Sequence, residues 1–439
     1  MTDKACQIMS TLGINELNKM QDEAYKGIAY GHGDVIVVSP TGSGKTLAYL
    51  LPLVGLLDER SEALQVVVIV PNRELAMQSV SVLNSMKLPL RAMCCYGGRS
   101  TMDEHRKIKQ IRPQVVFGTP GRLIDHFDKG NLSSYTVRYA VIDEFDKLLE
   151  MGFLKEMATL FSKLPGVRRR FLLSATNAEQ IPDFVNINNA TRVNYSYENI
   201  ASRLNVFSLR SEEKDKLVAL CDLLCVLGTQ SSMVFLNYRD SVERVTEYLK
   251  CRGFVVSMFH GGLDQKSREA ALYRFSNGSS NIFVSTDLAS RGLDIPEVNN
   301  IIHYHLPLTN DSFIHRVGRT ARWQSTGNVY FLLSPGEEVP DYVGENFSEF
   351  VMQKDLPEPS LPIMATVYVG KGKKDNISKG DILGFLCKVG GLGKDDIGKI
   401  DVRERYTYVA VKRDKVNQVL SMTDGRKIKG IKTKIEIVK

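Results

Sequence analysis

A glycine-rich turn between an apolar strand and a helix constrains this chain more than any other feature of its sequence. The turn, Ser39-Pro-Thr-Gly-Ser-Gly-Lys-Thr46, follows the apolar run 34–38 and precedes the apolar run 47–51. Glycines let successive backbone N–H groups surround a phosphate, and the helix that follows adds the positive end of its dipole. The pattern therefore predicts a phosphate-binding loop formed by Ser39, Thr41, Gly42, Ser43, Gly44, Lys45 and Thr46.

A second apolar run, 139–142, ends in two acidic residues, Asp143 and Glu144. We expect Lys45 to reach the β- and γ-phosphates of a nucleotide and the Thr46 hydroxyl to bind Mg²⁺. Asp143 is expected to hold the same metal, partly through water, and Glu144 to act as the base for an attacking water. Together these residues predict a Mg²⁺-dependent nucleoside triphosphatase.

The composition indicates a globular protein with several domains. The chain has 439 residues, of which 43% are hydrophobic, which is enough for two to three cores. It contains no run of about 18 apolar residues, and residues 1–6 lack the basic-then-apolar order of a signal peptide. The seven cysteines form no Cys-x-x-Cys pair. We therefore expect a cytoplasmic protein with reduced thiols and no membrane contact.

The positive charge of the chain is concentrated near its end. Residues 361–439 hold 18 Lys and Arg against 9 Asp and Glu, a balance of +9, which leaves −2 of the total of +7 for the other 360 residues. A basic tail on a nearly neutral body favours an anionic partner such as a nucleic acid, although a solvated basic surface has the same composition.

Two long segments of the chain alternate strand-like apolar runs with helical stretches, and a polar stretch near residue 200 separates them. Continuous apolar runs fit parallel sheets that are covered by helices on both faces. We expect a first domain at residues 1–196 and a second at residues 203–353. The clearest strands are expected at 66–70, 114–117, 139–142 and 170–173 in the first domain, and at 233–236, 254–259, 281–284 and 300–304 in the second.

The end of the chain follows a different pattern. Residues 354–363 hold three prolines and are expected to form a semi-rigid linker. Residues 364–439 show the order strand, helix, strand, strand, helix, strand, a split-βαβ arrangement that RNA-recognition modules share with unrelated domains. The elements are expected at 365–369, 378–389, 400–403, 406–411, 414–420 and 434–438.

Some residues in these segments have more than one interpretation. Tyr368, Tyr406 and Tyr408 lie on expected strands, where they either stack RNA bases or reflect the ordinary β-propensity of tyrosine. His260 and His315 have no His or Cys at metal-ligand spacing, so we expect no zinc site at either.

Taken in order, the motifs resemble those of the DEAD-box RNA helicases across residues 13–322. Gln21 precedes the phosphate loop at that family's spacing, and Asp143-Glu-Phe-Asp146 takes the place of the tetrapeptide that names the family. The resemblance implies an α/β fold with two RecA-like parallel-sheet domains, followed here by the small RRM-like split-βαβ domain. The other matches are Pro71-Asn-Arg-Glu-Leu-Ala76, Gly97-Gly98, Thr119-Pro-Gly-Arg122, Ser174-Ala-Thr176, Phe235-Leu-Asn237, His260-Gly261, Gln265 with Arg268, the run 286–294, and the run 315–322.

The resemblance also implies roles for individual residues. ATP is the expected nucleotide, with Gln21 reading adenine and with Gly292 and Asp294 near the nucleotide from the second domain. Arg316 and Arg319 are implied as arginine fingers, which are typically worth about 10³–10⁵ in rate. Coupling between nucleotide and RNA is implied for Asp146, Ser174, Thr176 and His315. Contacts to the RNA backbone are implied for Arg73, Gly97, Gly98, Thr119, Arg122, Gly261, Gln265, Arg268 and Thr286.

The tail resembles the C-terminal RNA-binding domain of the bacterial DbpA/YxiN group of these helicases. The resemblance rests on the segments 381–386, 390–392, 397–402 and 406–408. It implies action on large-subunit (23S) ribosomal RNA within a pre-ribosomal particle during ribosome assembly, by a chain that we expect to be a monomer. Two alternatives stay open: an RNA-dependent ATPase clamp or RNA chaperone of the cold-shock helicase type, and a DNA translocase.

Overall fold

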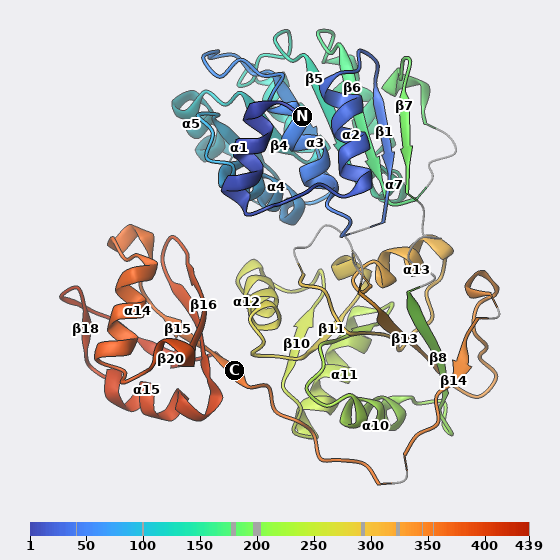
Figure 1. The fold of residues 1–439 in the computed structure, drawn as a ribbon, viewed down its shortest axis with the longest axis vertical. Coiled ribbons are helices and arrows are strands. Elements are labelled where there is room, and N and C mark those ends of the chain that lie inside the picture. Colours follow the sequence, from blue (N-terminus) through green and yellow to red (C-terminus); the bar gives the residue numbers. More distant parts are fainter. Residues whose placement is uncertain are drawn as a thin grey trace. The chain divides into compact units, whose positions relative to one another are not determined.

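The computed structural model describes residues 1–40, 42–98, 101–176, 181–195, 203–290, 295–321, 325–344, 346–353 and 355–438. These residues form two compact units (Figure 1). The first consists chiefly of Met1–Arg203 and also includes Phe313–Gly318. The second holds the rest of the described chain, up to its end.

The first unit contains a seven-stranded parallel sheet with the order β3-β4-β2-β5-β6-β1-β7. Its strands are β1 (Val35–Val38), β2 (Val66–Ile69), β3 (Ala92–Cys95), β4 (Val115–Gly118), β5 (Tyr139–Asp143), β6 (Arg169–Ser174) and β7 (Thr191–Asn194). The helices are α1 (Asp3–Leu12), α2 (Lys19–Ala29), α3 (Lys45–Leu53), α4 (Arg73–Ser85), α5 (Thr101–Ile111), α6 (Pro120–Asp128), α7 (Phe145–Glu150) and α8 (Leu154–Ser162).

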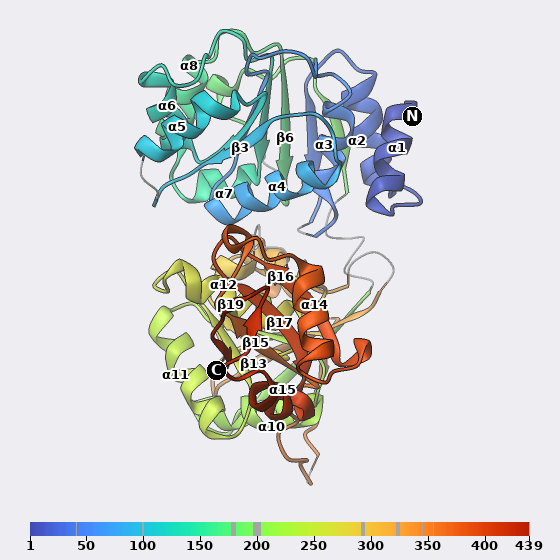
Figure 2. The same cartoon turned by 90° about the vertical axis from the view of Figure 1, so that its left-hand side faces the viewer.

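Apolar residues on both faces of each strand explain why helices cover this sheet on two sides. Val35 and Val37 of β1 pack into a core with α1 to α4, whereas Ile36 and Val38 pack into a second core with α5 to α8. Figure 2 shows α1 and α2 on one side of the sheet and α5, α6 and α8 on the other. The expected parallel sheet with two covered faces is confirmed.

The second unit contains another seven-stranded parallel sheet, with the order β10-β11-β9-β12-β13-β8-β14. Its strands are β8 (Leu204–Arg210), β9 (Ser232–Phe235), β10 (Val256–Phe259), β11 (Ile282–Ser285), β12 (Asn300–His303), β13 (Gly327–Leu333) and β14 (Ser348–Glu349). The helices are α10 (Leu217–Leu227), α11 (Arg239–Cys251) and α12 (Gln265–Ser276). A further helix, α13 (Asn310–Val317), begins in this unit, but its residues from Phe313 onward group with the first unit.

A small antiparallel sheet, β16-β17-β15-β20, follows in the same unit and confirms the expected split-βαβ order. Its core lies between the sheet and two helices. Two details differ from expectation: β16 begins at Ile397, three residues early and with a register shift, and an unexpected hairpin precedes β20. The elements are β15 (Met364–Val369), α14 (Lys379–Lys388), β16 (Ile397–Val402), β17 (Thr407–Lys412), α15 (Val416–Thr423), β18 (Lys427–Ile428), β19 (Ile431–Lys432) and β20 (Ile435–Ile437).

The other face of the small sheet packs against α12. The rings of Tyr273 and Tyr408 stack with centroids 5.1 Å apart, and the Tyr273 hydroxyl donates to the Tyr408 carbonyl oxygen at 3.1 Å. The Tyr406 hydroxyl donates to a Glu269 carboxylate oxygen at 3.1 Å. Tyr408 is only 3% exposed. The tyrosines of this face therefore pack against a protein helix, an arrangement that neither sequence-based interpretation predicted.

Among the helices of the described residues, none is both long and apolar enough to cross a membrane.

Candidate functional site

Parallel strands place their carboxyl ends at one edge of a sheet, and in the first unit this edge gathers the candidate residues of that unit. Ligands of open α/β sheets bind at this edge because the loops there converge. The phosphate loop follows β1, the pair Asp143–Glu144 ends β5, and Ser174 ends β6. These three strands are neighbours in the order β5-β6-β1, so residues up to 135 positions apart in sequence meet at one place.

The phosphate loop has the backbone shape that its glycines predict. Gly42 and Gly44 have φ values of +83° and +87°, a conformation that residues with a Cβ rarely adopt. The Lys45 Nζ donates to the carbonyl oxygens of Ser39 and Pro40, which directs the ammonium across the loop. Thr46 lies in the first turn of α3, where free N–H groups and the helix dipole favour phosphate. Thr41 lies outside the described residues.

Gln21 packs directly against the phosphate loop. Its side chain is 3% exposed, and its Nε2 donates to the Gly44 carbonyl oxygen at 3.3 Å. Its Oε1 accepts from the backbone N–H of Asn18, and the Asn18 side chain donates in turn to the Ser43 carbonyl oxygen at 3.0 Å. The start of α2 is thereby tied to the loop, which places Gln21 beside the expected nucleotide.

Asp143 and Glu144 form a buried acidic pair, 2% and 4% exposed. Burial, and then the negative charge of Glu144, raise the pKa of Asp143 to about 7. The Asp143 Oδ2 is buried and has no hydrogen-bond partner among the described residues. A buried carboxylate oxygen of this kind suits a hard cation, so Asp143 with the Thr46 hydroxyl fits Mg²⁺. Glu144 is held in the left-handed region at φ +53°, a strained conformation that is concentrated at functional sites.

Asp146 connects the ends of β5 and β6. Its Oδ2 accepts hydrogen bonds from the backbone N–H groups of Ala175 and Thr176 and from the Thr176 hydroxyl, at 3.1–3.2 Å. His315, which groups with the same unit, places its Nε2 3.1 Å from this oxygen. We expected Ser174 to share the bridge, but its hydroxyl has no partner within the described parts of the chain, and Thr176 and the backbone of Ala175 make it instead.

The two expected finger residues are buried. Arg316 in α13 is 0% exposed and Arg319 just after this helix is 1% exposed. A buried guanidinium is retained in proteins where it is paired, and both side chains do have interaction partners. Gly292 and Asp294 lie outside the described residues.

The expected RNA contacts of the first unit follow the neighbouring strands β3, β4 and β2. Arg73 is the first residue of α4, after β2, and a Cβ on Gly98 would lie 3.7 Å from its Nη1. Gly97 and Gly98 follow β3 and are exposed. Thr119 precedes α6 after β4, and the Arg122 side chain reaches back to α5. These residues therefore share one half of the edge, and the nucleotide residues share the other.

The second parallel sheet repeats this partition. Gly261 follows β10 and is exposed, and Thr286 follows the adjacent β11. Gln265 and Arg268 lie in the first turn of α12, where the Gln265 Nε2 donates to Glu269 and the Arg268 Nε donates to the Leu263 carbonyl oxygen. The segment with Arg316 follows β12 instead.

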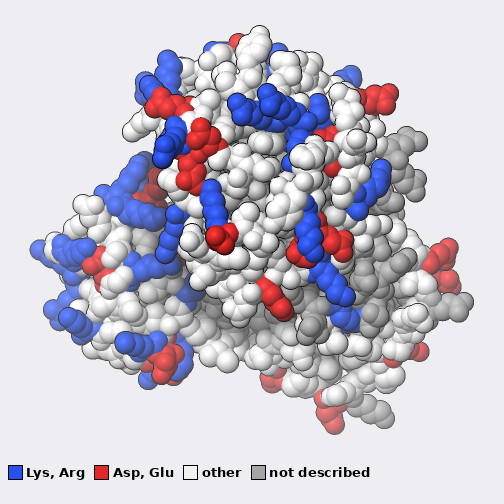
Figure 3. All heavy atoms as spheres, turned by 45° about the horizontal axis from the view of Figure 1, so that its top comes forward, with Lys and Arg blue, Asp and Glu red and all other residues white. Residues whose placement is uncertain are grey.

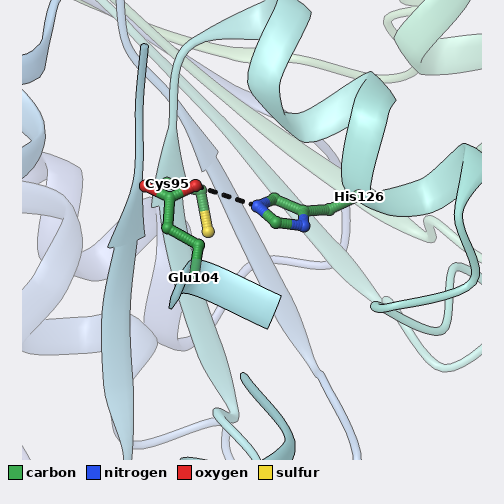
Figure 4. Close-up of side chains that lie close together, drawn as sticks. All are labelled: Cys95, Glu104 and His126. Carbon is green, nitrogen blue, oxygen red and sulfur yellow. Dashed lines mark hydrogen bonds and ion pairs between the residues drawn. The ribbon is translucent and has the colours of Figure 1, made fainter. Parts of the chain in front are cut away.

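Sequence reasoning missed one buried polar group in the first unit. Cys95, Glu104 and His126 come from β3, α5 and α6 and point toward one another (Figure 4). Their spacing in the sequence matches no metal-binding or catalytic motif, so nothing in the sequence indicated that the three side chains meet.

Comparisons with known proteins agree with this geometry. Residues 18–184 match the DEAD/DEAH box helicase family, residues 215–324 the helicase conserved C-terminal domain, and residues 366–437 the DbpA RNA binding domain. The chain is 30% identical to the ATP-dependent RNA helicase DbpA of Escherichia coli K12, over 98% of this chain and 96% of that protein. It is 28% identical to the Bacillus subtilis protein of the same name, over 97% and 95%.

A solved structure, S. cerevisiae Dbp5 bound to RNA and ADP BeF3, has a similar fold. The TM-score is 0.71 at 23% identity, over 80% of this chain and 94% of that one.

The contact between Gln21 and Gly44 makes the loop sensitive to a single methyl group. A Cβ on Gly44 would lie 2.3 Å from the Gln21 Nε2, in a backbone conformation that already disfavours it. We expect Gly44→Ala to weaken nucleotide binding by about 10-fold or more, because the loop must change conformation and its N–H groups no longer point at the phosphate. Titration with a fluorescent ATP analogue measures the effect.

Gly130→Ala is the matched control for this substitution. Gly130 has a φ of +65°, but its Cβ would meet no atom within 4 Å. It should therefore cost similar backbone strain and leave nucleotide affinity unchanged. Equal affinities of the wild type and Gly44→Ala would contradict the assigned role of the loop.

Proposed function

Because this chain belongs to the DEAD-box ATP-dependent RNA helicases of the DbpA type, we propose that it uses ATP and Mg²⁺ to remodel short duplexes in large-subunit (23S) ribosomal RNA during ribosome assembly. The proposed setting is the cytoplasm, with a single chain acting on a pre-ribosomal particle. The single observation that carries the proposal is the partition of candidate residues along the strand order of the two parallel sheets.

In this proposal the first unit binds the triphosphate. Lys45 and the N–H groups of the loop bind phosphate oxygens, and Thr46 and Asp143 hold the metal, which neutralises phosphate charge when bound. Glu144 accepts the proton of the attacking water, and its strained backbone holds the carboxylate in place at the strand end. Gln21 selects adenine from its position against the loop.

Arg316 and Arg319 complete the site by stabilising the charge that develops on the transferring phosphoryl group. Arginine suits this role because its planar guanidinium presents several N–H donors at once. Hydrolysis then depends on RNA, because RNA bound along both sheets favours the arrangement in which the arginines act. Asp146, Thr176 and His315 transmit the nucleotide state to the RNA side.

The RNA contacts of the two parallel sheets carry no base readout. Arg73, Arg122 and Arg268 suit phosphate oxygens, and the exposed Gly97, Gly98 and Gly261 offer backbone N–H groups, with Thr119, Gln265 and Thr286 beside them. Specificity for ribosomal RNA must therefore come from the small domain, residues 364–439.

The small domain offers a basic surface at the start of α14. Both faces of its sheet are covered, one by its own helices and the other by α12. Lys429 bonds to Asn376 and Asp381, which brings the β18–β19 hairpin beside the loop before α14. Lys and Arg gather over the small domain at the lower left of Figure 3. The exposed basic residues of this surface are Lys373, Lys374, Lys379, Arg426, Lys427, Lys429 and Lys432.

Binding of a ribosomal RNA hairpin to this basic surface raises the effective concentration of neighbouring duplexes at the helicase sheets. The two functions, holding and remodelling, thereby lie in different parts of the chain. Each is open to a separate test.

Arg316→Ala tests the catalytic assignment. We expect ATP turnover in saturating RNA to fall by about 10³-fold or more, because charge stabilisation in the transition state is lost. RNA binding by the basic surface should stay largely intact. Arg316→Lys, which keeps charge and bulk, should still lose most turnover, and Ser312→Ala in the same helix is the control. If Arg316→Ala hydrolyses ATP as fast as the wild type does, Arg316 is not an arginine finger.

The double substitution Lys373→Glu with Lys374→Glu tests the holding function. Both side chains are exposed, so we expect the fold to persist. The concentration of a large-subunit ribosomal RNA fragment that half-saturates ATPase stimulation should rise about 10-fold or more, because phosphate contacts become repulsive. The value for an unrelated single-stranded RNA should not change.

Lys394→Glu, in the 3₁₀ turn beyond the other end of α14, is the control for charge reversal away from this surface, with half the charge change of the double variant. An equal shift with both RNAs in the double variant, or no shift with either, would contradict the assignment of this surface to ribosomal RNA.

A further inference from the structure

The proposed function leaves the Glu104 carboxylate unexplained, although this buried group contacts three other residues. It lies on α5 and is 2% exposed. Cys95 at the end of β3 and His126 in α6 surround it, both 0% exposed. One ligand atom from each of these three residues lies within 4.8 Å of the others (Figure 4). A metal ion and a hydrogen-bonded network are the two explanations to separate.

The hydrogen bonds of His126 favour the network. Its Nε2 lies 3.0 Å from the Glu104 Oε2, and its Nδ1 lies 3.0 Å from the Asn131 Nδ2. An amide nitrogen donates and does not accept, so Nδ1 accepts and Nε2 carries the proton that it donates to Glu104. Neither ring nitrogen then has a lone pair for a metal. Burial, and then the charge of Glu104, raise the pKa of the Cys95 thiol, whereas metal binding needs a thiolate.

The same carboxylate reaches the loops after two neighbouring strands. Its Oε1 accepts from the backbone N–H of Tyr96 at 3.4 Å, directly before Gly97 and Gly98. Its Oε2 lies 3.6 Å from the Arg122 Nε in the loop–helix segment after β4. The Arg122 Nη1 also donates to the Thr101 hydroxyl, again on α5. One buried group is thus connected to two elements that are expected to bind RNA.

We propose that Glu104 is a positioning residue for RNA binding, which holds the Gly97–Gly98 turn and the Arg122 side chain in register while His126 fixes the carboxylate. This inference rests on the proposed RNA contacts of Gly97, Gly98 and Arg122. A free arginine side chain loses rotamer freedom when it binds a phosphate, and an arginine that a buried carboxylate already holds loses less. Glu104 itself touches no RNA.

The test measures ATP hydrolysis against the concentration of an unstructured oligouridylate at fixed salt. We expect Glu104→Ala to raise the half-saturating RNA concentration by about 3- to 10-fold, the range that ordering one flexible side chain gives. ATP affinity without RNA and the maximal rate in saturating RNA should not change. Glu104→Gln keeps the side-chain volume and one acceptor oxygen, which can serve either His126 or the Tyr96 N–H but not both. It also loses the charge toward Arg122, so it should give an intermediate value.

Two further variants make the result specific. Asp34→Asn removes the charge of another buried carboxylate, which is 2% exposed and lies directly before β1, at the amino end of this strand. The Asp34 carboxylate accepts from the backbone N–H groups of Arg170 and Asn188. This substitution should lower thermal stability without changing the half-saturating RNA concentration. Arg122→Ala should raise that concentration by itself. If Glu104→Ala proves too unstable to purify, the Gln variant carries the comparison.

Each remaining outcome has one meaning. If Arg122→Ala leaves the half-saturating RNA concentration unchanged, the RNA contacts proposed for the first unit are wrong. The positioning role of Glu104, which rests on them, is then wrong too. If Arg122→Ala raises the half-saturating RNA concentration but neither Glu104 variant does, the proposed RNA contact of Arg122 is supported and the positioning role of Glu104 is wrong. Stoichiometric Zn²⁺ in the purified wild type that is lost in Cys95→Ser would replace the network with a metal site.

Discussion

Parallel pairing of strands is the constraint on which the rest of this structure depends. It brings the ends of β1, β5 and β6, which are far apart in sequence, to one edge of the first sheet. Asp143 ends β5, Thr176 follows β6, and Lys45 begins the helix after β1. The apolar residues that make such strands possible face both ways and require helices on both sides. The candidate binding and catalytic residues therefore lie in the polar loops at the carboxyl edge.

The order of the strands adds a second level of organisation. In the first sheet β5 separates β3, β4 and β2 from β6 and β1, so Asp146, just beyond β5, lies between the residues proposed to contact RNA and those proposed to bind the nucleotide. One carboxylate oxygen accepts from two backbone N–H groups, a hydroxyl and His315. A change at the nucleotide that moves the end of β5 or β6 must rearrange this set, because buried donors are costly to leave without an acceptor. In the proposed function, Asp146 therefore links the nucleotide residues to the RNA contacts.

Local features of the structure were predictable from sequence, and distant side-chain partners were not. The loop 39–46 and the split-βαβ order follow from spacing and periodicity, which short-range geometry dictates. Ser174 was placed correctly at a strand end, yet its hydroxyl does not make the expected bridge, because side-chain direction depends on packing around β5 and β6. Tyr408 and Glu104 meet partners more than 20 positions away or in another domain, and no periodicity encodes such pairs. Neither interpretation of the tyrosines, base stacking or β-propensity, predicted that Tyr408 packs against α12, an element of the neighbouring domain.

In the proposed function, RNA held by the small domain activates an ATPase whose residues lie at the edges of the two parallel sheets. The most direct measurement is the rate of ATP hydrolysis by the full chain without RNA, with unrelated RNA and with large-subunit ribosomal RNA fragments, all at one salt concentration because phosphate binding depends on salt. We expect little hydrolysis without RNA and the strongest activation by one ribosomal fragment at low concentration. Hydrolysis that is independent of RNA, or equal activation by every RNA at the same concentration, would contradict it.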